Sequence, residues 1–105
     1  MGYPKISTLL KRGSKTYGEL FGGVIAHGCG CAVGTIVLEA TKGAAINENF
    51  MPDWVAKKLG LEPGKTDYRF WQKGNGSLAA KINNLHFRKT KSREFIANWL
   101  AKSGK

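Results

Sequence analysis

Glycines punctuate this chain throughout and limit it to short structural segments. There are fourteen of them among 105 residues, and no internal repeat or low-complexity tract accompanies them. Glycine favours turns and helix ends because it lacks a β-carbon. Most of the segments between the glycines have helix-forming patterns. We therefore expect a mainly α, small single-domain fold over residues 1–105, since a chain of this length holds one hydrophobic core.

The opening segment predicts a helix over about residues 8–13. Ser7 is a typical N-cap, Leu9 and Leu10 would face inward, and Gly13 would close the helix. The exposed side of this helix is basic.

A second helix is predicted between Pro52 and Gly60. Proline is favoured at the first helical position, and glycine is favoured just past a helix C-terminus. Val55 and Leu59 stand at i and i+4 between them.

Two segments in the first half leave alternatives open. Residues 18–30 are glycine-rich around Val24-Ile25-Ala26, which fits a short β-hairpin or an irregular glycine-rich segment better than a helix. Residues 31–41 are nearly all apolar, so periodicity does not separate a buried strand from a buried helix. Their length favours a helix, whereas their β-branched residues favour a strand.

The final third predicts a C-terminal helical hairpin. Ser77 and Ser92 are suited to cap its two helices. Apolar residues recur at helical spacing in both: Leu78, Ile82 and Leu85 in the first, and Ile96, Trp99 and Leu100 in the second.

The same C-terminal residues resemble a known family. Ile82-x-x-Leu85, followed after a linker by Ser92-Arg93-Glu94-x-Ile96-Ala97-x-Trp99-Leu100, is similar to the C-terminal pattern of an uncharacterised family of small phage, prophage and bacterial proteins. Cys31-Ala32-Val33-Gly34 resembles that family's Cys-Ala-Leu-Gly segment, which implies a helix for residues 31–41. Some relatives carry a Cys-x-x-Cys pair where this chain has Tyr68-Arg69-Phe70-Trp71, so the resemblance implies no metal site here. The resemblance implies a fold but no activity.

Charge is concentrated at the two ends of the chain, and the net charge is +10. Residues 1–15 carry +4 with no acid, residues 16–80 are neutral, and residues 81–105 carry seven bases against one acid, or +6. Such a distribution predicts a sided electrostatic field that attracts polyanions.

The basic linker of the hairpin is the expected binding surface. Residues 86–91 lead into the N-cap Ser92, and a helix N-terminus with flanking cations favours phosphate. The outline is that of a helix-turn-helix, although a linker of some six residues exceeds the usual three or four. The predicted nucleic-acid-binding residues are Arg88, Lys89, Lys91, Arg93, Lys81, Lys11 and Arg12. The alternative is a plain hairpin with solvated lysines.

A second candidate surface contains interleaved aromatic and basic residues. Tyr68, Phe70 and Trp71 alternate with Arg69 and Lys73, as in proteins that stack single-stranded bases. They could equally anchor a protein partner. Closing the core is the commoner role of such aromatics.

No metal, cofactor or catalytic site is predicted. His27, Cys29 and Cys31 lie close together, with His86 distant, but zinc sites usually contain two separated ligand pairs. No group is available to orient a Cys–His nucleophile, and the carboxylates form no acid–base pair.

We therefore expect a cytoplasmic, non-enzymatic, phage-type protein that binds nucleic acid, with DNA favoured. The alternative is a phage-derived interaction protein that inhibits an acidic host protein. No stretch is apolar enough for a membrane span, and the N-terminus has no apolar leader.

Overall fold

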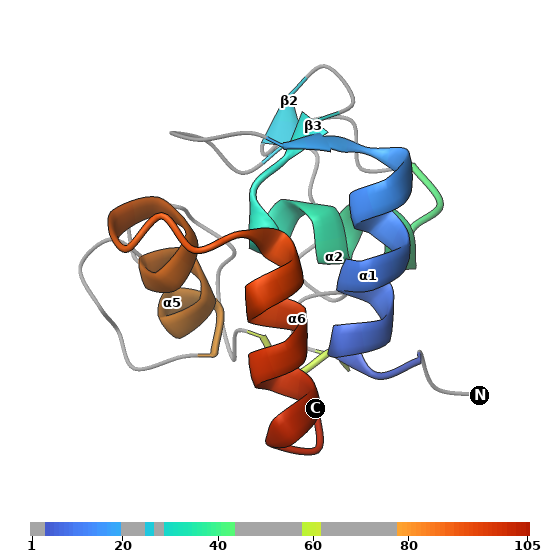
Figure 1. The fold of residues 1–105 in the computed structure, drawn as a ribbon. Helices are drawn as coiled ribbons and strands as arrows, with labels where there is room; N and C mark the ends of the chain where they lie inside the picture. Colours follow the sequence, from blue (N-terminus) through green and yellow to red (C-terminus); the bar gives the residue numbers. More distant parts are fainter. Residues whose placement is uncertain (1–3, 20–24, 27–28, 44–57, 62–77) are drawn as a thin grey trace.

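The computed structural model describes residues 4–19, 25–26, 29–43, 58–61 and 78–105. This part of the chain is mainly helical, which confirms the predicted fold class (Figure 1). Its longer helical elements are α1 (Ile6–Thr16), α2 (Ala32–Ala40), α5 (Leu78–Asn83), the π-helical turn η2 (Asn84–Arg88) and α6 (Arg93–Lys102).

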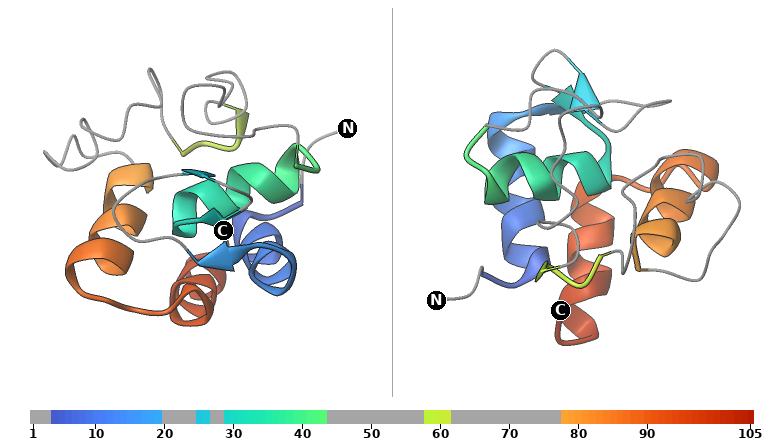
Figure 2. Two further views of the ribbon diagram at one scale, coloured as in Figure 1. Left: turned by 90° about the horizontal axis from the view of Figure 1, so that it is seen from above. Right: turned by 180° about the vertical axis from the view of Figure 1, so that it is seen from behind.

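Helices α1 and α6 pack side by side in opposite directions (Figures 1 and 2). At one end of the pair, the Ser7 N–H donates a hydrogen bond to the Lys105 carbonyl at 3.1 Å. At the other end, Arg93 Nη1 donates to the Tyr17 carbonyl at 2.8 Å. Each helix therefore begins beside the end of the other.

Helix α1 is longer at both ends than the sequence pattern predicted. It begins at Ile6 after Lys5, which makes no side-chain cap hydrogen bond. The predicted cap, Ser7, is instead a buried residue of the first turn. Its backbone N–H is satisfied by the Lys105 carbonyl, which takes the place of a side-chain cap.

Gly13 lies inside α1, so the prediction that it ends the helix was wrong. A β-carbon at Gly13 would lie 2.6 Å from Thr35 Cγ2 and 2.9 Å from the Thr35 carbonyl oxygen. Gly13 therefore lies at a close approach of α1 and α2, where the absence of a side chain allows the helices to pack.

Residues 32–40 form helix α2, which settles the alternative left open by the sequence. Cys31 is its N-cap, with Sγ accepting a hydrogen bond from the Gly34 N–H at 3.4 Å. Residues 32–38 are all buried, so this part of the helix is covered on every side. Burial overrides the strand preference of its β-branched residues.

The glycine-rich segment contains short strands, which is one of the two alternatives that the sequence left open. In the described residues, β1 (Gly18–Glu19), β3 (Cys29–Gly30) and β2 (Ile25–Ala26) form a sheet in that order. Strand β1 is parallel to β3, and β2 is antiparallel to it. A β-carbon at Gly30 would lie 2.6 Å from the Thr35 nitrogen, so glycine allows β3 to contact the start of α2.

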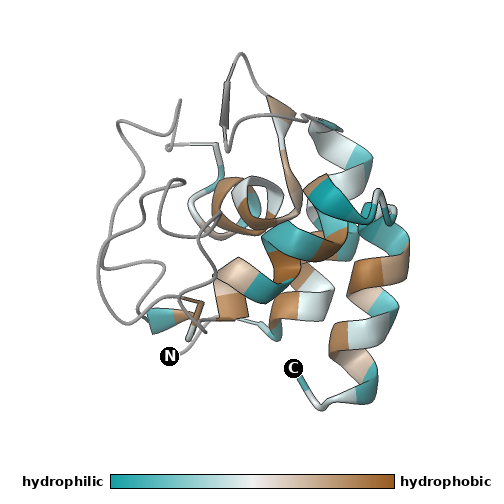
Figure 3. Cartoon of the chain, turned by 90° about the vertical axis from the view of Figure 1, so that its left-hand side faces the viewer, coloured by the Kyte–Doolittle hydropathy of each residue, from teal (hydrophilic) through white to brown (hydrophobic). Residues whose placement is uncertain are grey.

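The hydrophobic core lies between the helices, where α2 crosses the α1–α6 pair (Figure 2). The helices carry both hydrophobic and hydrophilic residues (Figure 3). The largest fully buried side chains are those of Leu10, Val33, Ile36, Leu38, Leu61, Ile82, His86, Ile96 and Leu100. Among the described helices, none combines the length and apolar character needed to cross a membrane.

The C-terminal hairpin has a shorter linker than predicted. Helix α5 continues through η2 as far as Arg88, so only Lys89–Ser92 joins it to α6. Ser92 is the predicted N-cap, and its Oγ accepts a hydrogen bond from the Phe95 N–H at 3.0 Å. Helix α6 packs mainly on α1, whereas α5 packs on α2.

Some predicted features lie wholly or mostly outside the described residues. Of the helix predicted between Pro52 and Gly60, only the end is described, where Gly60 has a φ of +74°. That conformation agrees with a glycine C-cap. The predicted surface of Tyr68, Phe70 and Trp71 is outside the described residues altogether.

Candidate nucleic-acid interface

The basic residues of the linker are exposed. Arg88 ends η2, and Lys89 and Lys91 belong to the segment that leads into α6. All three precede the beginning of α6 in the chain, where backbone N–H groups and the helix dipole favour negative charge. The first turn of α6 also contains Glu94, whose negative charge is favoured by the same helix dipole.

Basic residues of α1 lie beside α6. A groove of about 400 Å³ runs between the two helices. Lys11, Ser14 and Lys15 form its α1 wall, and Glu94 and Asn98 form its α6 wall. The antiparallel packing thus brings the basic N-terminal segment next to the basic C-terminal one.

The remaining predicted cations are placed differently. Arg12 is exposed on α1 but does not line this groove. Lys81 is exposed on α5, which packs on α2. The structure therefore brings Lys11 next to α6 but does not bring Lys81 there.

Arg93 differs from the predicted phosphate contact because its guanidinium points inward. Its side chain is 11% exposed. The guanidinium donates hydrogen bonds to three backbone carbonyls at the end of α1 and the start of β1: Tyr17 O at 2.8 Å, Gly18 O at 3.4 Å and Ser14 O at 3.4 Å. It also donates to the hydroxyl of Thr35 at 3.0 Å. Arg93 thereby satisfies carbonyls left unpaired at a helix C-terminus.

A buried polar cluster adjoins Arg93. His86 is completely buried, and its Nε2 lies 2.8 Å from Glu19 Oε2. The same carboxylate oxygen lies 3.9 Å from Arg93 Nε. The cluster connects η2, β1 and α6, so it holds the basic linker against the body of the protein.

Two exposed phenylalanines flank the linker, and the sequence analysis did not single them out. Phe87 in η2 is 37% exposed, and Phe95 in α6 is 46% exposed. Lys91 Nζ lies 5.0 Å from the centroid of the Phe95 ring, a cation–π contact. Phe95 falls outside the apolar stripe of Ile96, Trp99 and Leu100, which is the signal that could have identified it.

The cysteines occupy different environments. Cys31 is buried as the cap of α2, and Cys29 is partly exposed on β3. Cys29 pairs with Gly18 across the strands, whereas Gly30 pairs with Glu19. Adjacent residues of a strand point to opposite faces, so the Cys29 thiol and the Glu19 carboxylate lie on opposite faces. In the described part of the chain, no group of three or more His, Cys, Asp or Glu side chains could hold a metal ion.

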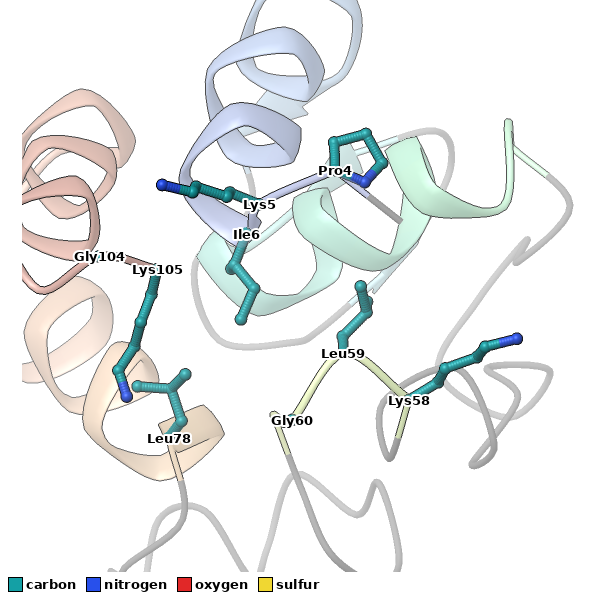
Figure 4. A pocket seen from close by; sticks show the side chains of 9 residues that line it. All are labelled: Pro4, Lys5, Ile6, Lys58, Leu59, Gly60, Leu78, Gly104 and Lys105. Carbon is teal, nitrogen blue, oxygen red and sulfur yellow. The ribbon is translucent and has the colours of Figure 1, made fainter. Parts of the chain in front are cut away.

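A second hollow lies at the other end of the α1–α6 pair. Its volume is about 410 Å³. Ile6, Leu59 and Leu78 point into it, whereas Lys5 and Lys58 point away (Figure 4). Lys105 also lines the hollow, with its side chain beside Leu78, so the lining combines apolar and basic groups.

Comparison with protein-family models, with curated protein sequences and with solved structures finds no match to this chain.

Proposed function

We propose that this protein binds nucleic acid through a basic surface around α6. We define this surface by the linker cations Arg88, Lys89 and Lys91 and the α1 lysines Lys11 and Lys15. One observation carries the proposal: α1, from the basic N-terminal segment, packs on α6, from the basic C-terminal segment, and its Lys11 and Lys15 line a groove between the two helices.

The physical basis is electrostatic. The segments that contribute the surface carry +4 and +6, and the residues between them are neutral. Clustered lysines and arginines release counterions from a nucleic acid when they neutralise its phosphates, and this release drives association. Lys89 and Lys91 are both exposed at the protein surface.

The direct test is a fluorescence-anisotropy titration with labelled single-stranded and duplex oligonucleotides of mixed sequence, at two salt concentrations. We expect binding that weakens steeply as salt rises, because released counterions oppose association. Lys89→Glu combined with Lys91→Glu should abolish it. No binding of either oligonucleotide at low salt would contradict the proposal.

Lys42→Glu is the matched control for charge reversal. Lys42 is exposed in the turn after α2 and forms an exposed 3.5 Å ion pair with Glu39. This turn and the α5–α6 linker lie on opposite sides of the α1–α6 pair (Figures 1 and 2). Lys42→Glu and Lys89→Glu alone each change the net charge by two units, and the control should weaken binding much less than Lys89→Glu alone.

An acidic protein partner is the second candidate, and the exposed Phe87 and Phe95 favour it. Aromatic side chains beside cations are typical anchors of protein interfaces. A protein of this second kind would have little affinity for bare oligonucleotides. It would instead form a defined complex that survives moderate salt and is lost on replacement of the phenylalanines.

A further inference from the structure

Basic, aromatic and amide side chains follow one another at the start of α6 and along its outer side. Lys91, Phe95, Asn98 and Lys102 follow one another at intervals of four, three and four residues, and all are exposed. Phe95, Asn98 and Lys102 are neighbours on α6, because residues three or four apart lie on the same side of a helix. Lys91 lies in the linker just before α6, and its Nζ is 5.0 Å from the centroid of the Phe95 ring. We call these four residues the α6 stripe. It combines two cations, an aromatic ring and an amide.

The composition of the α6 stripe suits unpaired bases. An exposed ring offers a face on which a base can stack, and a neighbouring cation can contact the adjoining phosphate. Phe95 is the most exposed large hydrophobic side chain among the described residues, with nearly half of its surface accessible. In a duplex, by contrast, the faces of the bases are covered by their neighbours.

The beginning of α6 is poorly suited to reading a duplex. A recognition helix places donor or acceptor side chains of its first turns against base edges in the major groove. Arg93, the residue type that most often reads guanine, is turned inward onto carbonyl oxygens. The exposed residues that follow are the acidic Glu94 and the apolar Phe95.

The groove beside the α6 stripe adds two lysines and one acid, Glu94, to the surface. Asn98 belongs both to the stripe and to the groove wall, and Lys11 and Lys15 stand opposite it on α1. A strand whose base stacks on Phe95 therefore has cations within reach on both helices. The partner that this arrangement fits is a single strand.

We propose that the α6 stripe binds single-stranded nucleic acid, with a base stacked on Phe95 and the neighbouring phosphates contacted by Lys91, Lys11 and Lys15. This inference rests on the proposed function and specifies its ligand.

The test compares single-stranded and duplex oligonucleotides of one sequence in anisotropy titrations with the wild-type chain, Phe95→Ala and Phe95→Trp. The wild-type protein should prefer the single strand. Removing the ring should weaken single-strand binding by about tenfold, because stacking on an aromatic side chain contributes that order of affinity. Phe95→Trp should retain binding, since tryptophan also offers a stacking face.

Phe87→Ala is the matched control. It removes another exposed ring near the linker but leaves the α6 stripe unchanged. Its effect should be smaller than that of Phe95→Ala. Circular dichroism should establish that each variant is folded, which is expected for Phe95→Ala because the cap to Ser92 uses the backbone N–H.

The outcomes separate the inference from the proposed function. Duplex binding as tight as single-strand binding, with Phe95→Ala unchanged, would overturn the inference and leave nucleic-acid binding standing. An equal loss on Phe87→Ala would also overturn the assignment to the α6 stripe. Absence of binding to either oligonucleotide at low salt would remove both proposals together.

Discussion

Arg93 brings a delocalised positive charge to a site formed by four oxygen acceptors. The acceptors belong to α1, β1 and α2, and the Glu19 carboxylate lies 3.9 Å from the guanidinium. A planar fork of donors can satisfy several carbonyls at once, which a lysine ammonium does less well. Arg93 therefore holds the start of α6 against the end of α1.

Replacing Arg93 with alanine should destabilise the fold. We expect the free energy of unfolding to fall by about 3 kcal/mol, because partly buried acceptors lose their donor. Arg93→Lys should recover only part of this loss. Urea denaturation gives the measurement, with the exposed Lys89→Ala as a control that should change the free energy by less than about 0.5 kcal/mol. A stability of Arg93→Ala equal to that of the control would contradict this role.

Single residues differ in how well their sequence context predicts their environment. The inward positions of Ile96 and Leu100 follow from helical periodicity, and the capping role of Ser92 follows from its residue type. The inward turn of Arg93 could not be predicted in this way. It depends on carbonyls some 75 residues away in the chain, which only the packing of α1 on α6 brings near.

At the level of elements, the contact between α1 and α2 depends on one glycine. The site for a side chain at Gly13 is filled by Thr35 Cγ2 and by the Thr35 backbone carbonyl. A flexible side chain could move away, but a carbonyl inside α2 can move only with the helix. The distance between the two helices is therefore set at this point.

Gly13→Ala should lower stability despite alanine's higher helix propensity. The propensity gain is about 1 kcal/mol, whereas overpacking typically costs about 1–3 kcal/mol. We expect a net loss in thermal or urea denaturation, partly relieved by adding Thr35→Ser. The exposed Thr16→Ala provides a control on the same helix. A stabilised Gly13→Ala would show that α1 and α2 do not meet as closely as described.

Sequence patterns indicated most of the described elements but not their partners. Short-range signals predicted α1 and both C-terminal helices, and the resemblance favoured a helix for α2. Gly13 was misread because a glycine that ends a helix and one that permits close packing look alike in a sequence. The predicted pairing of the C-terminal helices was likewise incomplete, since α6 packs mainly on α1.

At the scale of the whole molecule, the fold brings the two terminal segments of the chain together where α1 packs on α6. The sequence established two basic ends separated by a neutral middle. It did not establish whether those ends meet, because that depends on the topology of the chain. The antiparallel packing of α1 on α6 places Lys11 and Lys15 across a groove from Glu94 and Asn98.

The central claim is that both basic ends contribute to one nucleic-acid-binding surface. The most direct test measures the association constant for single-stranded DNA at several salt concentrations. The slope of its logarithm against the logarithm of salt concentration is compared between the wild-type chain and the double variant Lys11→Ala, Lys15→Ala. Each lost phosphate contact should reduce the magnitude of the slope by about 0.7, so the double variant should reduce it by about 1.4. Lys42→Ala should leave the slope unchanged. A wild-type slope retained by the double variant would show that α1 takes no part in the surface and would contradict the account.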